Sequence, residues 1–250
     1  MVFAGKTDKG FVRRTNQDCF AALSLDEDAV LAVVCDGMGG ANGGNVASTL
    51  AVKTFCEKIQ SAWRKNIQPK SVYNLMKSAA AAANITVFDK AKSDETLSGM
   101  GTTVVSAILF GGMAYIIHAG DSRAYKFNGR EAVQITRDHS VVQAMVESGK
   151  ISKSAARVHP RKNVITRALG VDENLDVEYC EVEIEEGEGI LLCSDGLTNF
   201  VSDEQISGIL KDAPLCDGPQ KLVDLANKNG GGDNITAVVV LREKGEKGNG

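Results

Sequence analysis

Four aspartates stand at the ends of apolar segments of strand length, and each has a glycine beside it. Asp36, Asp121 and Asp195 follow such segments, whereas Asp233 precedes one. If the fold gathers these carboxylates at one sheet edge, their burial and mutual repulsion are costly unless they are compensated. Two hard divalent cations such as Mg²⁺ or Mn²⁺ would cancel the four charges and prefer oxygen ligands. Spacing alone leaves the alternative open, because Asp-Gly is also an ordinary turn dipeptide.

A polar, cationic segment over residues 7–18 carries Arg13 and Arg14. An arginine beside a metal cluster suits a tetrahedral phosphate, because the guanidinium group pairs with two phosphoryl oxygens at once. The same residues also fit a solvated turn with two surface arginines. The segment indicates a phosphate site only together with the aspartates.

The strands that must position these residues come in blocks. The continuous apolar run 29–35 is typical of a strand buried on both faces. Gly111-Gly112 and Asn128-Gly129 each stand between two apolar segments and predict tight hairpins. A third hairpin is predicted from strands 178–184 and 189–193. After one short strand near the N-terminus, the predicted strands are 19–25, 29–35, 103–110, 113–118, 125–127, 132–135, 178–184, 189–193 and 235–241.

The predicted helices stand between these strand blocks. Ser140 with Gln143, and Ser202 with Gln205, have the spacing of a capping box. The predicted helices are 46–63, 69–90, 140–149, 204–211 and 222–227. Such blocks predict an α+β fold with antiparallel sheets covered by helices, because a parallel sheet needs alternating strands and helices. No linker divides the chain, so we expect one domain over residues 1–242 and a disordered Lys- and Gly-rich tail over 243–250.

Composition excludes several classes of protein. The 250 residues carry 28 basic and 32 acidic side chains, and this net charge of -4 argues against a nucleic-acid binder. No apolar run approaches the roughly 20 residues of a membrane span, and the N-terminus has no secretory signal, so we expect a cytoplasmic protein. The six cysteines form no C-x-x-C pair, and the three histidines have no metal-ligand spacing, so we do not expect a zinc or histidine site.

Six short motifs follow one another along most of the chain. They are T-D-K-G-x-x-R-x-x-N-Q-D at 7–18, D-G-M-G-G at 36–40, G-M-G-T-T at 99–103, G-D-S-R at 120–123, C-S-D-G-L-T-N at 193–199 and G-G-D-N-I-T at 231–236. In this order they resemble the PPM family of metal-dependent protein serine/threonine phosphatases, also called protein phosphatase type 2C, in its compact bacterial form. The resemblance implies an α-β-β-α sandwich of two antiparallel sheets flanked by helices.

The resemblance also implies a set of metal ligands. Asp36 matches the carboxylate that bridges two Mn²⁺ or Mg²⁺ ions, and the Gly37 carbonyl matches a ligand of the first ion. Asp195 and Asp233 match ligands of the second ion. Asp121 matches a ligand of a third, weaker ion.

Two further residues match the reaction chemistry of the family. Arg13 matches the arginine that grips the phosphate, and Asp18 matches an acidic position that orders metal-bound water. The implied activity is hydrolysis of phosphoserine and phosphothreonine in proteins by a metal-bridged hydroxide, which reverses Ser/Thr kinase signalling. The implied partners are phosphorylated proteins, Ser/Thr kinases among them, and we expect a monomer that binds neither nucleic acid nor membrane.

Two positions depart from the family pattern. Met38 stands where many eukaryotic members have a histidine that is a candidate general acid, and a thioether cannot donate a proton. Asn199 stands where the third ion would have a carboxylate, and a neutral amide oxygen is a poorer ligand.

Three other readings of the sequence are weaker. A phosphoprotein-binding module without catalysis conflicts with the intact aspartates and Arg13. A haloacid-dehalogenase-like phosphatase needs a second aspartate where Met38 stands, and a P-loop needs a Lys-Ser/Thr pair that the glycines at 39–44 lack.

Segment 143–170, which matches a mobile flap of the family and is called the flap here, is strongly basic. It is either a solvated face or a docking surface for phosphorylated, acidic segments.

Overall fold

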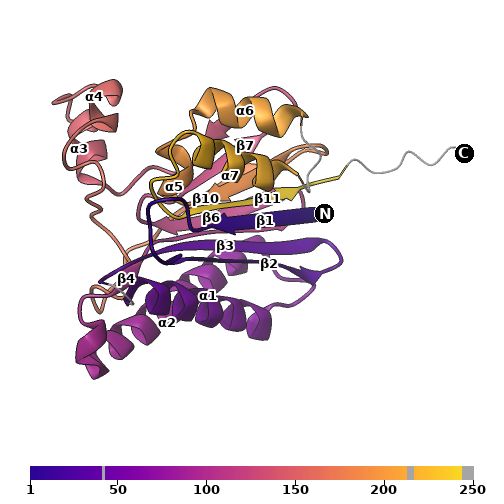
Figure 1. The fold of residues 1–250 in the computed structure, drawn as a ribbon. Helices are drawn as coiled ribbons and strands as arrows, with labels where there is room; N and C mark the ends of the chain where they lie inside the picture. Colours follow the sequence, from indigo (N-terminus) through magenta and orange to yellow (C-terminus); the bar gives the residue numbers. More distant parts are fainter. Residues whose placement is uncertain (41–42, 213–216, 244–250) are drawn as a thin grey trace, which may run out of the picture.

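Two antiparallel β-sheets pack face to face and carry helices on both outer faces (Figure 1). This layering confirms the predicted fold class. The computed structural model describes residues 1–40, 43–212 and 217–243, so the predicted tail, apart from Glu243, lies outside the described residues. Among the described helices, none is long and apolar enough for a membrane span.

The first sheet has the strand order β1-β11-β10-β7-β8. Its strands are β1 (Val2–Asp8), β11 (Ile235–Leu241), β10 (Gly189–Cys193), β7 (Arg123–Phe127) and β8 (Ala132–Gln134). The second sheet has the order β2-β3-β5-β6-β9, and the short strand β4 pairs with the end of β3. Its strands are β2 (Asp18–Asp26), β3 (Ala29–Met38), β4 (Gly101–Thr102), β5 (Val104–Phe110), β6 (Met113–Ala119) and β9 (Glu178–Glu183).

Two groups of helices cover the outer faces of the sheets. The second sheet is covered by α1 (Gly43–Ala62) and α2 (Pro69–Ser93), and the first by α5 (Asp195–Thr198), α6 (Asp203–Asp212) and α7 (Gly218–Lys228). The short helices α3 (Val141–Glu147) and α4 (Lys153–Arg157) project from the body (Figure 1), and a 3₁₀ turn, η1, spans Glu95–Leu97.

The apolar run of β3 is buried on both faces, as its sequence predicts. Leu31 and Val33 pack in the layer with α1 and α2, whereas Val30, Ala32 and Val34 pack between the two sheets. A strand with helices on one side and a sheet on the other has no solvated face, so no polar residue interrupts its sequence.

The third predicted hairpin is wrong. Strand β9 pairs with β6 in the second sheet, whereas β10 pairs with β7 and β11 in the first. The turn residues between them carry the chain from one sheet to the other, and Ile184 is buried between the sheets at the start of this crossing. A polar turn looks the same in sequence whether it joins paired strands or crosses between sheets.

The predicted capping box is confirmed in full at the start of α6 and in part at the start of α3. Ser202 and Gln205 exchange both bonds of a capping box at α6. Ser140 caps α3 through the Gln143 backbone N–H, but the Gln143 side chain donates to Glu147 instead. The sequence patterns did not indicate α4, α5 or β4, which are each too short to show a period.

Candidate metal centre

Asp36 stands near the end of β3, where the chain turns into α1. The Asp36 N–H donates to Thr103 Oγ1, and the Thr103 N–H donates to the Asp36 carbonyl oxygen, both at 2.9 Å. The next residue, Gly37, packs so closely on Gly44 that a Cβ atom at Gly37 would lie 2.0 Å from the Gly44 carbonyl oxygen. Only glycine fits this close approach, which holds the Asp36–Gly37 backbone at the sheet edge.

Asp18 lies directly opposite Asp36 in the β2–β3 register and is buried. Its Oδ2 atom accepts hydrogen bonds from Thr236 Oγ1 at 2.6 Å and from Ser194 Oγ at 2.7 Å. Thr236 belongs to β11 and Ser194 directly follows β10, both in the first sheet, so Asp18 joins the two sheets at this edge. Its other oxygen, Oδ1, is buried and finds no hydrogen-bond partner among the described residues.

Asp195 is the first residue of α5, directly after β10 and Ser194. Its Oδ2 atom accepts a hydrogen bond from Asn199 Nδ2 at 2.9 Å, and its carboxyl group lies within hydrogen-bonding reach of Asp36. The following residue, Gly196, packs against the residue directly before β11, since a Cβ atom there would lie 1.9 Å from the Asn234 carbonyl oxygen. The strand end therefore delivers Asp195 to the edge where Asp36 stands.

Asp233 precedes β11 and holds Arg13. Arg13 Nη2 donates to Asp233 Oδ2 at 2.8 Å, with the arginine side chain about half exposed. The neighbouring Asn234 fixes the loop that carries Arg13: its Oδ1 accepts from the Gln17 N–H, and its Nδ2 donates to the carbonyl oxygens of Lys9 and Thr15. Arg13 thus stands beside the aspartates on a pinned loop.

The carboxyl groups of this cluster raise one another's pKa values. Burial raises the pKa of Asp36 well above its ordinary value, and the charges of Asp18 and Asp195 raise it further. Burial raises the pKa of Asp18 to about 6, against the two hydroxyl donors that lower it. Burial and then the charge of Asp233 raise the pKa of Asp195, and burial and then the charge of Asp195 raise that of Asp121. These charge effects on Asp18, Asp36, Asp121 and Asp195 require their carboxyl groups to lie close to one another, and those of Asp18, Asp36 and Asp195 to lie close to Asp233.

The cluster fits divalent cations. Arg13 is bonded to Asp233, and Arg123 is bonded to Asp138 at 2.7–2.8 Å, so these cations leave most of the five aspartate charges uncompensated. Asp18 Oδ1, a buried acceptor with no partner in the described part of the chain, would be satisfied by a cation or an ordered water. All donors are carboxylate or carbonyl oxygens, the ligands that Mg²⁺ and Mn²⁺ prefer.

Sequence reasoning named the aspartates but missed the residues that hold them. Ser194 and Thr236 bind Asp18, Thr103 binds Asp36, and Asn234 binds the Arg13 loop. Each stands within a recognised motif, and all but Thr103 stand within three residues of an aspartate in the sequence. Small hydroxyl and amide residues at buried strand ends are therefore the signal that could have found them.

A histidine cluster lies beside this edge, because the Gly120 N–H, directly before Asp121, donates to His139 Nδ1 at 3.2 Å. Sequence spacing did not indicate this cluster. His118 and His139 are buried with their rings stacked 4.6 Å apart, and Glu178 Oε1 lies 3.1 Å from His139 Nε2. These three side chains have the geometry to hold a metal ion. However, Arg167 Nη1 already lies 3.2 Å from His139 Nε2, and its positive charge disfavours a cation there.

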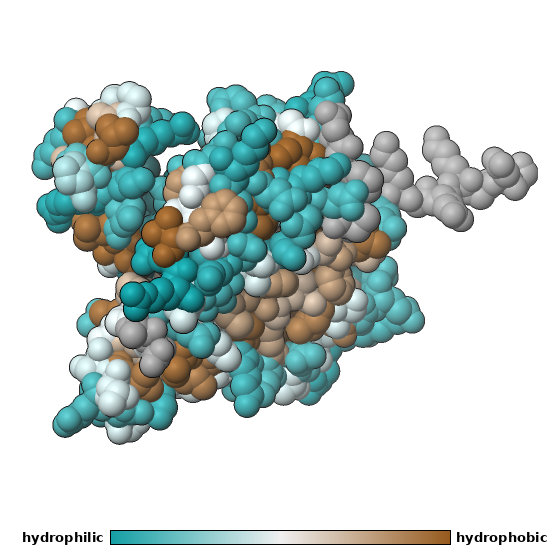
Figure 2. Space-filling model, in the orientation of Figure 1, coloured by the Kyte–Doolittle hydropathy of each residue, from teal (hydrophilic) through white to brown (hydrophobic). Residues whose placement is uncertain are grey.

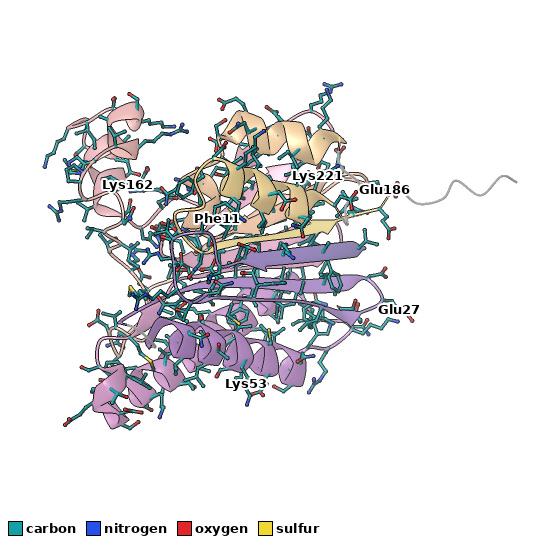
Figure 3. All side chains as sticks on the ribbon, in the orientation of Figure 1. Phe11, Glu27, Lys53, Lys162, Glu186 and Lys221 are labelled. Atoms are coloured by element: carbon teal, nitrogen blue, oxygen red, sulfur yellow. The ribbon has the colours of Figure 1, made fainter. Side chains whose placement is uncertain are left out.

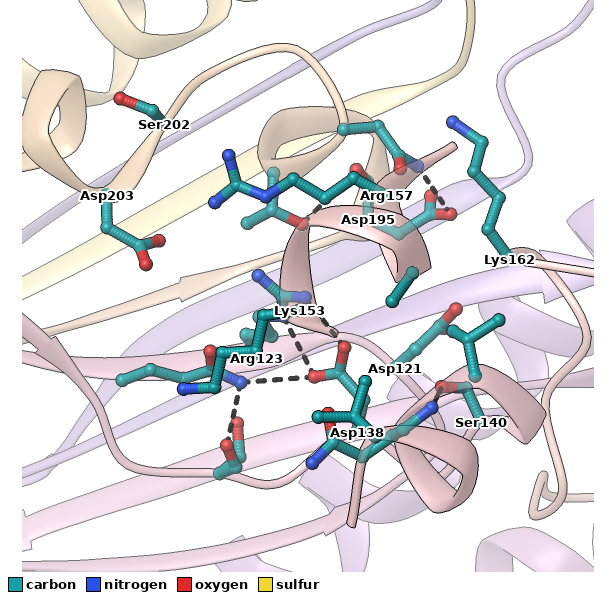
Figure 4. Close-up of a pocket in the computed structure, with 18 of the residues that line it drawn as sticks. Asp121, Arg123, Asp138, Ser140, Lys153, Arg157, Lys162, Asp195, Ser202 and Asp203 are labelled. Atoms are coloured by element: carbon teal, nitrogen blue, oxygen red, sulfur yellow. Dashed lines mark hydrogen bonds and ion pairs between the residues drawn. The ribbon is translucent and has the colours of Figure 1, made fainter. Parts of the chain in front are cut away.

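A cleft of about 550 Å³ opens from the aspartates toward the flap. Asp121 and Asp195 line its inner end, and residues of the flap and of the loop before α6 line its two sides (Figure 4). The cleft gives a substrate access to the carboxylate cluster from the side where α3 and α4 project.

Comparisons with known proteins agree with this geometry. Residues 12–223 match the family model described as Protein phosphatase 2C. The serine/threonine phosphatase stp of Listeria monocytogenes serovar 1/2a is 35% identical over 247 residues, covering 97% of this chain and 96% of that protein. The crystal structure of Stp1 from Staphylococcus aureus has a TM-score of 0.91 at 32% identity, covering 97% of this chain and 95% of that chain. The catalytic domain of PstP in complex with two manganese ions has a TM-score of 0.84 at 32% identity, covering 95% and 96%.

Proposed function

This chain belongs to the protein phosphatase 2C family, and we propose that it hydrolyses phosphoserine and phosphothreonine in proteins at a centre of two Mn²⁺ or Mg²⁺ ions. It is a metal-dependent serine/threonine protein phosphatase. The observation that carries the binuclear centre is the gathering of Asp18, Asp36, Asp195 and Asp233 at one sheet edge, where a buried Asp18 oxygen has no donor among the residues that the structure describes. A relative of 32% identity has been crystallised with two manganese ions.

Each ligand has a proposed place. Asp36 would bridge both ions, with the Gly37 carbonyl oxygen on the first and Asp195 and Asp233 on the second. Asp121 would hold a third ion weakly, because Asn199 offers only a neutral amide and already donates to Asp195. When bound, the cation pair would supply a hydroxide nucleophile near neutral pH and neutralise charge on the phosphoryl oxygens.

Two side chains, Arg13 and Asp18, would act on the phosphate and on the attacking water. Arg13, oriented by Asp233, would pair with two equatorial phosphoryl oxygens and stabilise the charge that develops on them. Asp18, held through Oδ2, would keep Oδ1 free to accept a hydrogen bond from the attacking water. The P–O ester bond would break as the oxygen of the attacking water bonds to phosphorus, and the leaving alkoxide would take its proton from water. Met38 cannot supply that proton.

The biological setting is also part of the proposal. Residues 1–242 would act as one catalytic domain and as a monomer in the cytoplasm. The substrates would be phosphorylated proteins, Ser/Thr kinases among them, and the activity would reverse kinase signalling.

The experiment is phosphate release from a phosphothreonine peptide and from p-nitrophenyl phosphate, after EDTA treatment and readdition of Mn²⁺. Asp36→Asn should lower turnover at least about a thousandfold, because it removes several kcal/mol of interaction with both cations. Asp89→Asn, an exposed change on α2, should keep full activity. Near-normal Mn²⁺-dependent turnover by Asp36→Asn, or calorimetry without cation uptake by the wild type, would overturn the proposal. Peptide binding without any turnover would instead indicate a binding module.

A further inference from the structure

The cleft beside the carboxylate cluster has a strongly cationic outer part. Three flap residues, Lys153, Arg157 and Lys162, line it together with Asp121 and Asp195 at its inner end (Figure 4). Its volume of about 550 Å³ lies within the range of ligand-binding pockets. The three cations therefore line one side of a space that begins at the proposed reaction centre.

These three cations differ from the other two in the cleft. Arg123 forms a two-bond ion pair with Asp138, and Arg137 pairs with Glu147. Within the described ranges, the side chains of Lys153, Arg157 and Lys162 form no hydrogen bond or ion pair, and all three residues are exposed. Among the described residues no acidic group forms an ion pair with any of the three, although the charge of Arg157 reaches Glu204 and contributes to lowering its pKa.

The acids that share the cleft are already engaged. Asp138 is taken by Arg123, and Asp203 accepts a hydrogen bond from Tyr125. Asp121 and Asp195 would be neutralised by the cations of the proposed centre. With the metals in place, the outer cleft is therefore a site of net positive charge, which attracts anions.

From this arrangement we infer that the cleft holds a second acidic group of the substrate protein, a few residues away from the phosphorylated side chain. The group is a carboxylate or a second phosphoryl group, since both accept charge-assisted hydrogen bonds from lysine and arginine. The inference rests on the proposed function, because it places the first phosphate at the carboxylate cluster. It gives the enzyme a preference for acidic or multiply phosphorylated segments.

A solvated cationic face would behave differently. Exposed charges on an open surface contribute little to binding and do not depend on where the acid stands in the peptide. The backbone that carries the three flap cations, α4 and the chain after it, places them on one side of a cleft that leads to the carboxylate cluster. An acid should therefore help at particular spacings only.

The experiment is an acid scan of a neutral phosphothreonine peptide. One residue at a time, from five before to five after the phosphothreonine, is replaced by aspartate or by phosphoserine, and kcat/KM is measured with Mn²⁺. The readout is the ratio of the acidic to the neutral peptide for each enzyme, so that general changes in activity divide out. The wild type should show a ratio of about ten at its best spacing, equivalent to about 1.4 kcal/mol. This ratio should fall as salt is added.

The variant that tests the assignment is Lys153→Gln/Arg157→Gln/Lys162→Gln, whose ratio should drop to about one. Lys53→Gln is the matched control, because Lys53 lies on α1 in the opposite layer of the molecule, far from Lys162 (Figure 3), and its ratio should not change. A preference for both acids, or for phosphoserine alone, supports the subsite and identifies its ligand.

Three results would overturn the inference. A flat scan in an enzyme that hydrolyses the neutral peptide would refute the subsite while leaving the proposed function intact. An unchanged ratio in the triple variant would place the preference elsewhere. Failure to hydrolyse any peptide or p-nitrophenyl phosphate would refute the proposed function, and the inference with it.

Discussion

Replacing Asp18 by asparagine should stabilise the metal-free protein at neutral pH. Burial raises the pKa of Asp18 from its ordinary 3.8 to about 6. The folded state therefore holds this proton more tightly than the unfolded state, and ionising the group costs folding free energy. A rise of this size corresponds to about 3 kcal/mol, an upper value because neighbouring carboxyl groups share the effect. Asparagine keeps an oxygen for Ser194 and Thr236 but loses the charge.

The pH dependence follows from the direction of this shift. Below about pH 4 the aspartate is protonated in both states, so wild type and Asp18→Asn should differ little in stability. As the pH rises through about 6, the wild type without metal should lose stability while the variant keeps it, a gain of about 1–3 kcal/mol after the cost of burying an amide. Excess Mn²⁺ should reverse the order, because cation binding stabilises the wild type more.

Urea unfolding in EDTA and in Mn²⁺, at pH 4 and pH 7.5, measures both effects. The exposed Asp89→Asn variant is the control and should follow the wild type throughout. If Asp18→Asn is less stable than the wild type in EDTA at pH 7.5, the carboxylates do not repel one another in the metal-free fold. The electrostatic case for a cation site would then fail.

Two further substitutions test the supports of the centre. Asn234→Ala removes three hydrogen bonds to the loop 9–17 and should lower the unfolding free energy by about 2–4 kcal/mol. Because this loop carries Arg13, the variant should also show weaker product inhibition by phosphate. Unchanged inhibition would show that Asn234 does not position Arg13. Asn199→Asp places a second carboxylate beside Asp195 and should tighten the binding of a third Mn²⁺ about tenfold, as measured by calorimetry. Unchanged uptake would show that the third ion does not bind beside residue 199.

Much of the fold could be predicted because the spacing of apolar residues in the sequence reflects which faces of a helix or strand are buried. The run that became β3 is apolar throughout because it has a helix layer on one side and a sheet on the other. The crossing between β9 and β10 could not be predicted, because a polar turn does not show which sheet the next strand joins. The short helix α4, which carries two of the cleft cations, has too few residues to show a helical period.

The aspartates of the centre were visible from their positions, but their convergence depends on registers that span the whole chain. Asp18 stands opposite Asp36 only because β2 and β3 pair in one particular register. Its hydroxyl partners Ser194 and Thr236 come from the other sheet, more than 170 residues away. Spacing can indicate that a carboxylate ends a strand, but only the packing of two sheets decides which strand ends meet.

The same geometry explains why this edge of the molecule is both unstable and useful. Packing acidic strand ends together raises the pKa values of Asp36, Asp121 and Asp195 and stores an electrostatic cost in the metal-free fold. A divalent cation relieves that cost when it binds, so the repulsion adds to its affinity. Hydrogen bonds from Ser194, Thr236 and Asn234 keep the cluster and its loop in place meanwhile. A protein selected for stability alone would replace these carboxylates, and retaining them is consistent with selection for cation binding.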